Sequence, residues 1–267
     1  MLILLLTFVS NIVWSIEDIS CVIEPKQMIK LNTAVNGVIE SVEVQRGDFV
    51  KKGQVIAHLE SAIEKSSVEL ARARAKNTFD IAATRSNIKL LKSKLSRLTK
   101  MNNVNKYTSD AEIEEVSTEL VIAKHQLNED LHQHKIAKLE LGYSEAVLAQ
   151  RIIRSPIDGV VVEKMMSPGE YRNEDNHIVT IAQIDHLNVE VFVPSSLHEN
   201  VAVGDEFTIT PEEPFKGKYT AIVTIVDQVF DAASGTFGMR LSLPNPDYKI
   251  PSGIKCSLHF RVPDREL

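Results

Sequence analysis

The segment NGVIESVEVQRGDFVKKGQVIAHL, residues 36–59, determines the predicted architecture because a similar segment recurs later in the chain. It aligns without a gap on DGVVVEKMMSPGEYRNEDNHIVTI, residues 158–181. The aligned positions share turn residues and apolar residues, among them Gly37 with Gly159, Gly47 with Gly169, Phe49 with Tyr171 and Ile56 with Ile178. Each copy is too short to bury a core alone, so we expect the two copies to pair as one small β-domain.

Six residues in and around the two copies are predicted to be structural turn residues: Gly37, Gly47, Gly53, Pro156, Gly159 and Gly169. Glycine reaches positive φ and allows close backbone packing, so these glycines need no ligand to explain them. Proline disfavours the helical region for the residue that precedes it. We therefore expect Pro156 to end the helix before it.

The composition is that of a folded soluble protein and excludes several classes. Of the 267 residues, 43% are hydrophobic and 25% are charged, which argues against a disordered chain and against a polytopic membrane protein. The formal net charge is −6 and we find no basic patch, whereas affinity for phosphate backbones needs clustered Lys and Arg. A nucleic-acid partner is therefore not expected.

Residues 1–15, MLILLLTFVSNIVWS, are predicted to be a secretory signal peptide cleaved after Ser15, or else an uncleaved N-terminal anchor. This apolar segment is short for a membrane span, which needs about 20 residues. Export would place the chain in an oxidising compartment. There its two cysteines, Cys21 and Cys256, can form a single bridge or remain two separate buried thiols.

Residues 61–150 lie between the two copies and are predicted to form an α-helical hairpin. No Gly or Pro occurs between Ser61 and Lys100, and apolar or small residues recur there in steps of three and four. The phase of this pattern slips once, at residues 79–82, as it would at a stutter in a long coiled coil. A continuous first helix is therefore expected.

A break at residues 101–110 separates the two predicted helices. Ser109 followed by Glu112 has the spacing of a capping box, which predicts that the second helix begins there. Apolar residues continue in steps of three and four from Ile113, and Gly142 is the only interruption before Gln150. A helix of roughly 38 residues extends about 57 Å.

After the second copy, several short β-strands are predicted within residues 186–262. Alternating or β-rich runs occupy residues 187–193, 203–209, 219–226, 239–243 and 254–262, separated by Pro, Gly and Asn. Such a series of short strands favours a small antiparallel β-barrel. The residues before Gly37 are expected to supply strands either to this region or to the repeat domain.

Together these residues resemble the periplasmic adaptor family, also called membrane fusion proteins, of haemolysin D type. The most specific parts of the resemblance are RSPIDGVV, residues 154–161, and the linked turns at Gly47 and Gly53. It implies a mainly β, elongated multidomain fold with a long inserted coiled-coil hairpin. The implied domains are a lipoyl-like β-sandwich from residues 22–60 and 151–185, an α-hairpin from residues 61–150 and an antiparallel β-barrel from residues 186–262.

The resemblance also implies a non-catalytic protein without a cofactor, located in the periplasm and associated with the inner membrane. Such adaptors join an inner-membrane transporter, of the RND or ABC type, to an outer-membrane channel protein for efflux or type I secretion, and several copies form a ring. Family members often have a further membrane-proximal domain. We expect that domain to be absent or reduced here.

In the family, residues at the hairpin tip contact the channel protein. The positions of this chain that match the tip motif hold Arg97, Met101 and Thr108, and Ser109 can replace Thr108 in the contact. A guanidinium can donate several hydrogen bonds, and a methionine can fill an irregular apolar groove. The alternative is that Arg97 is a solvated helix charge and Met101 packs in the helix seam.

Hypotheses from other classes explain less of the sequence. A lipoyl or biotinyl carrier presents a lysine at an exposed β-turn between its two halves, whereas Lys65 here belongs to a predicted helix. A structural coiled-coil protein of the envelope would account for the hairpin but not for the duplicated β-unit. No catalytic motif is recognised. No metal site is expected, because His125, His132 and His134 lack the three- or four-residue spacing of a shared helix face.

Overall fold

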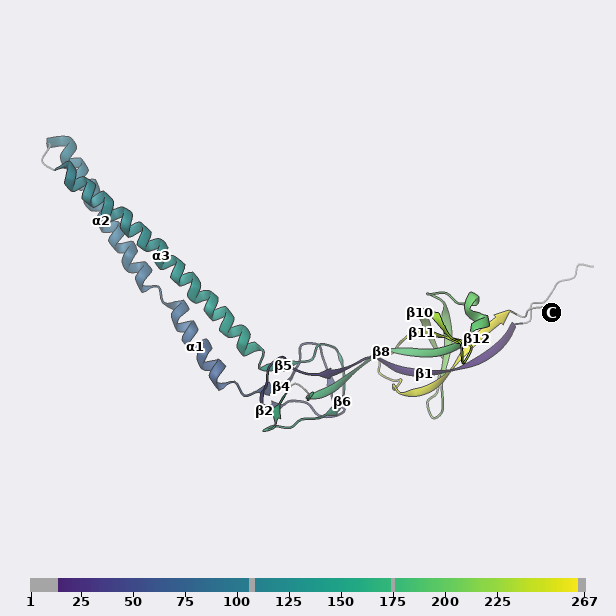
Figure 1. Cartoon of the computed structure of the whole chain (residues 1–267). Helices are drawn as coiled ribbons and strands as arrows, with labels where there is room; N and C mark the ends of the chain where they lie inside the picture. Colours follow the sequence, from purple (N-terminus) through teal and green to yellow (C-terminus); the bar gives the residue numbers. More distant parts are fainter. Residues whose placement is uncertain (1–13, 106–108, 174–175, 264–267) are drawn as a thin grey trace, which may run out of the picture. The chain divides into compact units, whose positions relative to one another are not determined.

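A computed structural model describes residues 14–105, 109–173 and 176–263 (Figure 1). The chain divides into two compact units. One is built from the described parts of Met1–Asn36, Ser41–Ala57 and Arg154–Leu267, and the other from those of Gly37–Glu40 and His58–Ile153. The fold is mainly β with an inserted helical hairpin, as predicted. None of the described helices is both long enough and apolar enough to cross a membrane.

The two sequence copies contain the same succession of strands, which confirms the duplicated β-unit. The first copy holds β2 (Gly37–Val42), β3 (Phe49–Val50) and β4 (Val55–Leu59). The second copy holds β6 (Gly159–Lys164), β7 (Tyr171–Arg172) and the start of β8 (Val179–Pro194). Aligned apolar residues have the same burial in both copies, since Ile56 and Ile178 are both fully buried.

The two copies also pair with each other. β3 of the first copy pairs antiparallel with β6 of the second, with Phe49 opposite Val160. The backbone N–H of Gly47 donates to the carbonyl of Val161 at 2.8 Å, and that of Val161 donates to the carbonyl of Asp48 at 2.9 Å. A four-stranded sheet has the order β5-β4-β2-β7, where β5 is Ile152–Arg154. Each copy thus gives its short middle strand to the sheet of the other.

The remaining strands pair in a closed circuit. β1 (Trp14–Leu31), β12 (Ile254–Pro263), β9 (Glu206–Pro211), β10 (Tyr219–Asp231), β11 (Thr236–Pro244) and β8 follow one another as neighbours, and β8 also pairs with β1. The inward side chains of this circuit form one buried cluster, to which the short 3-10 helix η1 (Ser195–Asn200) adds Leu197. The five predicted strand runs overlap β8 to β12, and the residues before Gly37 supply β1.

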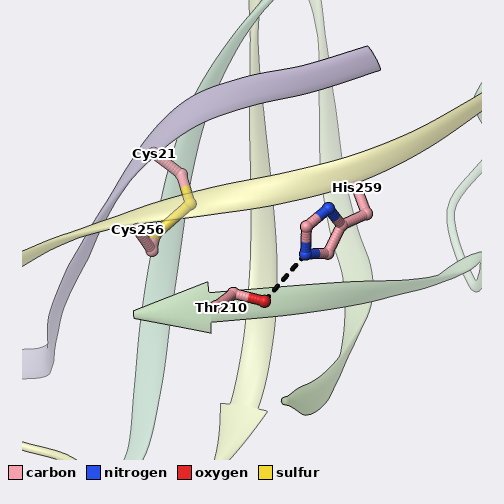
Figure 2. The surroundings of a disulfide bond; sticks show 4 residues. All are labelled: Cys21, Thr210, Cys256 and His259. Atoms are coloured by element: carbon pink, nitrogen blue, oxygen red, sulfur yellow. Dashed lines mark hydrogen bonds between the residues drawn. A yellow bond between two sulfur atoms is a disulfide. The ribbon is translucent and has the colours of Figure 1, made fainter. Parts of the chain in front are cut away.

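Cys21 and Cys256 form a disulfide with an S–S distance of 2.04 Å, which decides between the two alternatives left by the sequence (Figure 2). The two residues lie opposite each other on β1 and β12. Both are buried. Of the predicted signal segment, residues 1–13 lie outside the described residues, while Trp14 and Ser15 begin β1 opposite Pro263 and Val262.

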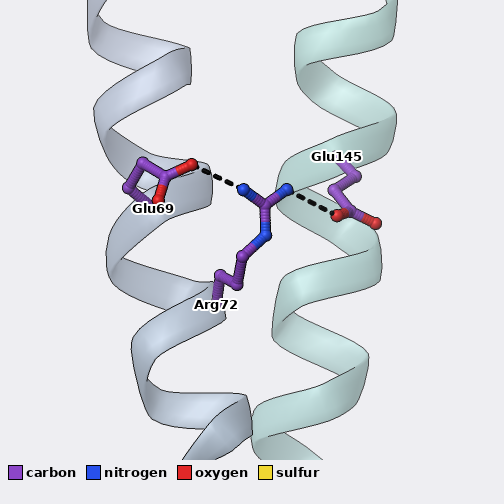
Figure 3. A network of polar contacts seen from close by, with 3 residues as sticks. All are labelled: Glu69, Arg72 and Glu145. Carbon is purple, nitrogen blue, oxygen red and sulfur yellow. Dashed lines mark hydrogen bonds and ion pairs between the residues drawn. The ribbon is translucent and has the colours of Figure 1, made fainter.

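The inserted segment forms two antiparallel arms, α1 (Ala62–Lys76) with α2 (Phe79–Asn105) on one side and α3 (Asp110–Ala149) on the other. Side-chain contacts between the arms join residues whose numbers rise on one arm as they fall on the other: Arg72 with Glu145 at 3.2 Å, Thr84 with Asp130 at 2.6 Å and Asn102 with Asp110 at 2.9 Å. Figure 3 shows Arg72 reaching both Glu69 on its own helix and Glu145 on α3. The seam packs Ile88 and Leu91 of α2 against apolar residues of α3.

The prediction of a continuous first helix was wrong. The helix stops at Lys76, Asn77 is extended with φ −70° and ψ 120°, and a new helix begins at Phe79. The side-chain oxygen of Asn77 accepts a hydrogen bond from the backbone N–H of Phe79 at 3.0 Å. An asparagine side chain can accept a hydrogen bond from an unpaired backbone N–H at the start of a helix. It therefore favours the start of a new helix here over continuation of the first. The slip in the apolar pattern marks this break.

The second arm begins where the sequence predicts, with a different cap. Ser109 is the N-cap of α3, but its hydroxyl accepts from Ala111 at 3.2 Å and not from Glu112, so the predicted capping box was wrong. α3 continues through Gly142 and ends at Ala149. β5 lies between that end and Pro156, so the prediction that Pro156 ends the helix was also wrong.

Candidate functional site at the hairpin tip

The tip of the hairpin lies where α2 ends and α3 begins. The amide of Asn102 donates to the carboxylate of Asp110 at 2.9 Å, which holds the two helices together at this point. Ser109 stands directly before α3 and is exposed. Thr108 lies outside the described residues. Of the four predicted contact residues, the structure therefore places Arg97, Met101 and Ser109.

Arg97 and Met101 lie one helical turn apart on α2, and both are exposed. The side chain of Met101 is among the exposed large hydrophobic residues, at 52%. Met101 is thus far more exposed than the seam residue Leu91, which is 9% exposed. The tip therefore presents a cation and a flexible apolar side chain on one helix, and a hydroxyl at the start of the other.

The predicted turn residues lie at two kinds of backbone position. Gly47, Gly53 and Gly169 have φ of 95°, 85° and 88°, which side chains with a Cβ rarely adopt. Gly37 and Gly159 do not have positive φ and are instead closely packed. A Cβ at Gly159 would clash with the backbone carbonyl of Ala182, whereas one at Gly37 would lie 2.8 Å from the Arg151 side chain.

Pro156 follows a residue that joins the two copies. Ser155 is buried, its backbone N–H donates to Gln54 at 2.9 Å, and its carbonyl accepts from Gly53 at 2.7 Å. The glycine turn of the first copy and the bend before β6 are therefore fixed to each other. Pro156 therefore follows a residue that is held in the scaffold on both sides.

An ion pair at the base of the hairpin escaped the sequence analysis. Arg151 follows α3, and its guanidinium donates to Glu64 of α1 at 2.6 Å and 3.0 Å. A hydrogen bond from the Glu64 backbone, together with the hydrogen bond and charge of Arg151, holds the pKa of Glu64 below its usual value against the effect of burial. No sequence signal links two residues so far apart in the chain.

A buried arginine was also missed. Arg172 is 2% exposed and donates to the carbonyl of Val35 at 3.2 Å and to the Asn36 side chain at 3.1 Å, and it also contacts Asn32. It aligns with Val50 of the first copy, which is equally buried. The apolar pattern of the repeat would place a hydrophobic residue there, so only the structure identifies this contact.

A polar cluster around His259 links neighbouring strands of the circuit. His259 on β12 contacts Thr210 on β9 at 2.7 Å (Figure 2). His259 also contacts Asp18 on β1 at 2.5 Å, so it joins three neighbouring strands. No group of three or more His, Cys, Asp or Glu side chains within the described ranges is arranged to hold a metal ion. Lys65 lies in the first turn of α1, and its backbone N–H donates to Ser61, so it does not stand on an exposed β-turn.

Comparison with known proteins places this architecture in a family. The family model for the CzcB-like, barrel-sandwich hybrid domain matches residues 27–183, which is more than half of the chain. The chain belongs to this family. The match confirms the resemblance to periplasmic adaptors, and it covers both copies of the β-unit and the hairpin between them.

Curated relatives of the adaptor include export and resistance proteins. The chain is 26% identical over 216 residues to the cobalt-zinc-cadmium resistance protein CzcB of Cupriavidus metallidurans, covering 79% of this chain and 38% of that one. It is 24% identical over 229 residues to the macrolide export protein MacA of Yersinia pestis, covering 82% of this chain and 60% of that one. The adaptor thus spans about two-fifths to three-fifths of the length of these relatives.

A solved structure has the same fold. The crystal structure of MacA from Actinobacillus actinomycetemcomitans matches with a TM-score of 0.77 at 22% sequence identity, covering 94% of this chain and 80% of that chain. At this level of identity the likeness establishes the fold alone. The chain is therefore a mainly β protein with a MacA-like fold and an inserted helical hairpin.

Proposed function

We propose that this chain is a non-catalytic periplasmic adaptor that links an inner-membrane transporter to an outer-membrane channel protein, and that several copies act together as a ring. The observation that carries this proposal is a hairpin with a 40-residue second arm, inserted between two copies of a β-unit that exchange strands. The chain enters the hairpin from β4 and leaves it into β5, and these two strands are neighbours in one sheet. A spacer needs such a fixed base. Family membership supports the same function.

The proposal assigns a part to each region of the chain. Residues 22–60 and 151–185 form the lipoyl-like domain, residues 61–150 the α-hairpin and residues 186–262 the β-barrel, while residues 1–15 form the signal peptide or anchor. The closed circuit of strand pairings supports the barrel. β1 and β8 run through the proposed boundaries, so the two β-regions share strands.

The proposed location is the periplasm, in association with the inner membrane. The disulfide between Cys21 and Cys256 supports it, because structural disulfides persist in oxidising compartments such as the bacterial periplasm. The transporter is proposed to be of the RND or ABC type. CzcB and MacA take part in metal resistance and macrolide export respectively, and the cargo of this adaptor is left for experiment.

Arg97, Met101, Thr108 and Ser109 are proposed to contact the channel protein. The exposure of Arg97 and Met101 supports this role, since neither is used within the hairpin seam. The Ser109 hydroxyl accepts the capping hydrogen bond from Ala111 and keeps its own proton to donate to a partner. Arginine suits such a contact because one guanidinium can donate to several carbonyl oxygens.

Arg97→Asp tests the tip. We expect this variant to fold normally, because Arg97 is exposed, but to lose both export and cross-linking to the channel protein. Lys138→Asp, which makes the same charge change at an exposed position of α3 far from the tip, is the control and should keep both. Purification of the complex from membranes, followed by mass spectrometry, identifies the transporter and the channel beforehand. Unchanged export by Arg97→Asp would remove the tip from the mechanism.

A further inference from the structure

Arg172 is a buried cation whose contacts within the described part of the chain are all to neutral groups. Its guanidinium donates to the carbonyl of Val35 and to the side-chain oxygens of Asn36 and Asn32. None of the ion pairs among the described residues involves Arg172, and its buried Nε has no hydrogen-bond partner among them. A buried charge is costly unless an opposite charge lies beside it. A carboxylate at this place would therefore stabilise the fold.

Asn36 is followed by Gly37, and this is the only Asn-Gly pair in the sequence. An asparagine is chemically labile because the backbone nitrogen of the next residue can attack its side-chain carbonyl carbon, after which ammonia leaves. Glycine hinders this attack least, since it has no Cβ and its backbone moves most freely. Asn36 is exposed and lies in the loop directly before β2, so water reaches it.

The contact between Arg172 and Asn36 favours this attack. An Nη1–H of Arg172 donates to Oδ1 of Asn36 at 3.1 Å. When the side-chain carbonyl carbon is attacked, negative charge develops on that same oxygen, and a positioned cationic donor stabilises such a charge. The contacts with Val35 and Asn32 hold the guanidinium, so the donor is in place before the reaction begins.

We propose that Asn36 is a deamidation site at which Arg172 promotes the reaction and then binds the product. The Gly37 nitrogen forms a bond to Cγ of Asn36, its proton passes to the departing amide nitrogen, and ammonia leaves a five-membered succinimide. Water then adds to Cγ, the bond between Cγ and the Gly37 nitrogen breaks, and that nitrogen takes a proton back. An aspartate now stands at position 36.

Arg172 also decides which product forms. Water that adds to the backbone carbonyl of the succinimide gives isoaspartate, whereas water that adds to Cγ gives aspartate. The guanidinium donates to the oxygen on Cγ and polarises that carbonyl, so addition at Cγ is favoured. Aspartate is therefore the main product, and its carboxylate lies beside the buried cation.

The second copy of the β-unit already contains the product residue. Asp158 stands before Gly159, at the position that aligns with Asn36. Its carboxylate accepts a hydrogen bond from the backbone N–H of Lys52 at 2.8 Å. An aspartate at this position is thus compatible with the β-unit, and in the first copy it would supply the opposite charge for Arg172.

Peptide mass spectrometry of the purified full chain, incubated at neutral pH, tests the reaction. Cleavage after Lys30 and Arg46 releases Asn32 and Asn36 in one peptide, and its fragmentation tells the two apart. We expect Asn36 to gain the mass difference between an amide and an acid several-fold faster than Asn32. Asn32 is the matched control, because it contacts the same guanidinium but precedes a threonine. An Asn36 that stays unchanged would overturn the proposal.

Arg172→Val separates the role of the arginine from that of the Asn-Gly pair. Valine is the residue at the aligned position of the first copy, so it suits the β-unit. The variant should deamidate Asn36 several-fold more slowly and with a larger share of isoaspartate. If circular dichroism showed that it does not fold, Arg172→Lys would take its place, since lysine lacks the guanidinium fork and should also slow the reaction. An unchanged rate in the folded variant would refute the role of Arg172.

Asn36→Asp tests the product directly. Urea unfolding should show a higher midpoint for this variant than for freshly purified unaltered protein, because the new carboxylate pairs with the buried guanidinium. The same change in the Arg172→Val background should give no such gain, since the partner is then missing. A midpoint for Asn36→Asp that is no higher than that of the unaltered protein would show that Arg172 does not bind the product.

Discussion

At the scale of single residues, aligned glycines in the two copies of the β-unit are needed for different reasons. A Cβ at Gly159 would clash with the Ala182 backbone carbonyl, so a side chain there requires the backbone to shift. At its counterpart Gly37, the one close neighbour of a Cβ would be the end of the Arg151 side chain, while Leu59 would lie at an ordinary contact distance. A backbone atom moves less readily than the end of a side chain. The two aligned glycine positions therefore differ in how well they tolerate a larger residue.

Gly159→Ala is expected to lower the free energy of unfolding by about 1–3 kcal/mol, as overpacking in a close-packed interior does. Gly37→Ala, the matched change in the other copy, should cost less because the Arg151 guanidinium can shift. Urea unfolding followed by circular dichroism measures both. Equal midpoints for the two variants would contradict the difference in packing.

At the scale of elements, a polar contact holds the two arms of the hairpin in register. The hydroxyl of Thr84 on α2 donates to the carboxylate of Asp130 on α3 at 2.6 Å, and Gln126 donates to the same carboxylate at 2.8 Å. These two hydrogen bonds hold the pKa of Asp130 below its usual value. If the two helices were shifted along each other, the hydrogen bond between Thr84 and Asp130 would be lost. This contact therefore favours the observed alignment of α2 with α3.

The lowered pKa gives the hairpin a pH dependence of known sign. Because the folded state favours the ionised carboxylate, this contact stabilises the hairpin above the ordinary aspartate pKa of about 3.9, and the effect is lost as the pH falls through the lowered value. Thr84→Val should raise the pKa of Asp130 and reduce the stability more at pH 7 than in acid. NMR titration of the carboxyl carbon measures the pKa.

Ser86→Ala is the control for that experiment. The Ser86 hydroxyl donates to the Ala82 carbonyl on its own helix and takes no part in the contact between the arms. The variant should therefore leave the Asp130 titration unchanged. If Thr84→Val and Ser86→Ala gave the same curve as the unaltered protein, the Thr84 hydroxyl would not be the cause of the lowered pKa.

At the scale of the whole molecule, one covalent bond joins the first described strand to the last. The disulfide between Cys21 and Cys256 spans a sequence separation of 235 residues. Linking distant residues restricts the unfolded chain, which is one source of disulfide stabilisation. The bridge therefore contributes to the strand circuit beyond the buried cluster itself.

Cys21→Ser/Cys256→Ser should lower the free energy of unfolding by about 2–4 kcal/mol. Both residues are replaced together so that no free thiol remains. Urea unfolding with and without reductant measures the effect: the unaltered protein should lose stability on reduction, and the variant should not respond. A variant as stable as the oxidised protein would show that the bridge adds nothing.

Sequence reasoning succeeded where a periodic pattern had one structural explanation. The ungapped repeat of residues 36–59 predicted the duplicated β-unit, and apolar steps of three and four predicted the seam that contains Ile88 and Leu91. It failed where a local contact overrode the pattern. The side chain of Asn77 caps the start of the next helix, so the first helix ends there. The only sign of this break in the sequence was the slip in the apolar pattern.

Contacts between distant residues left no trace in the sequence. Arg172 is buried at a position where the repeat has Val50, because Val35, Asn36 and Asn32 supply oxygen acceptors for its guanidinium. At the tip, the sequence supplied candidate residues, and the structure adds that Arg97 and Met101 are exposed.

The pairing of β1 with β12 has a consequence for the order in which the chain folds. A nascent chain on the ribosome that has not reached residue 254 contains β1 but lacks the strand that pairs with residues 14–23. Contacts between such distant segments form slowly, and an unpaired strand edge invites aggregation in the meantime. Because the circuit closes only after synthesis has passed β12, the pairing of the first strand with the last is the final step in completing the sheet.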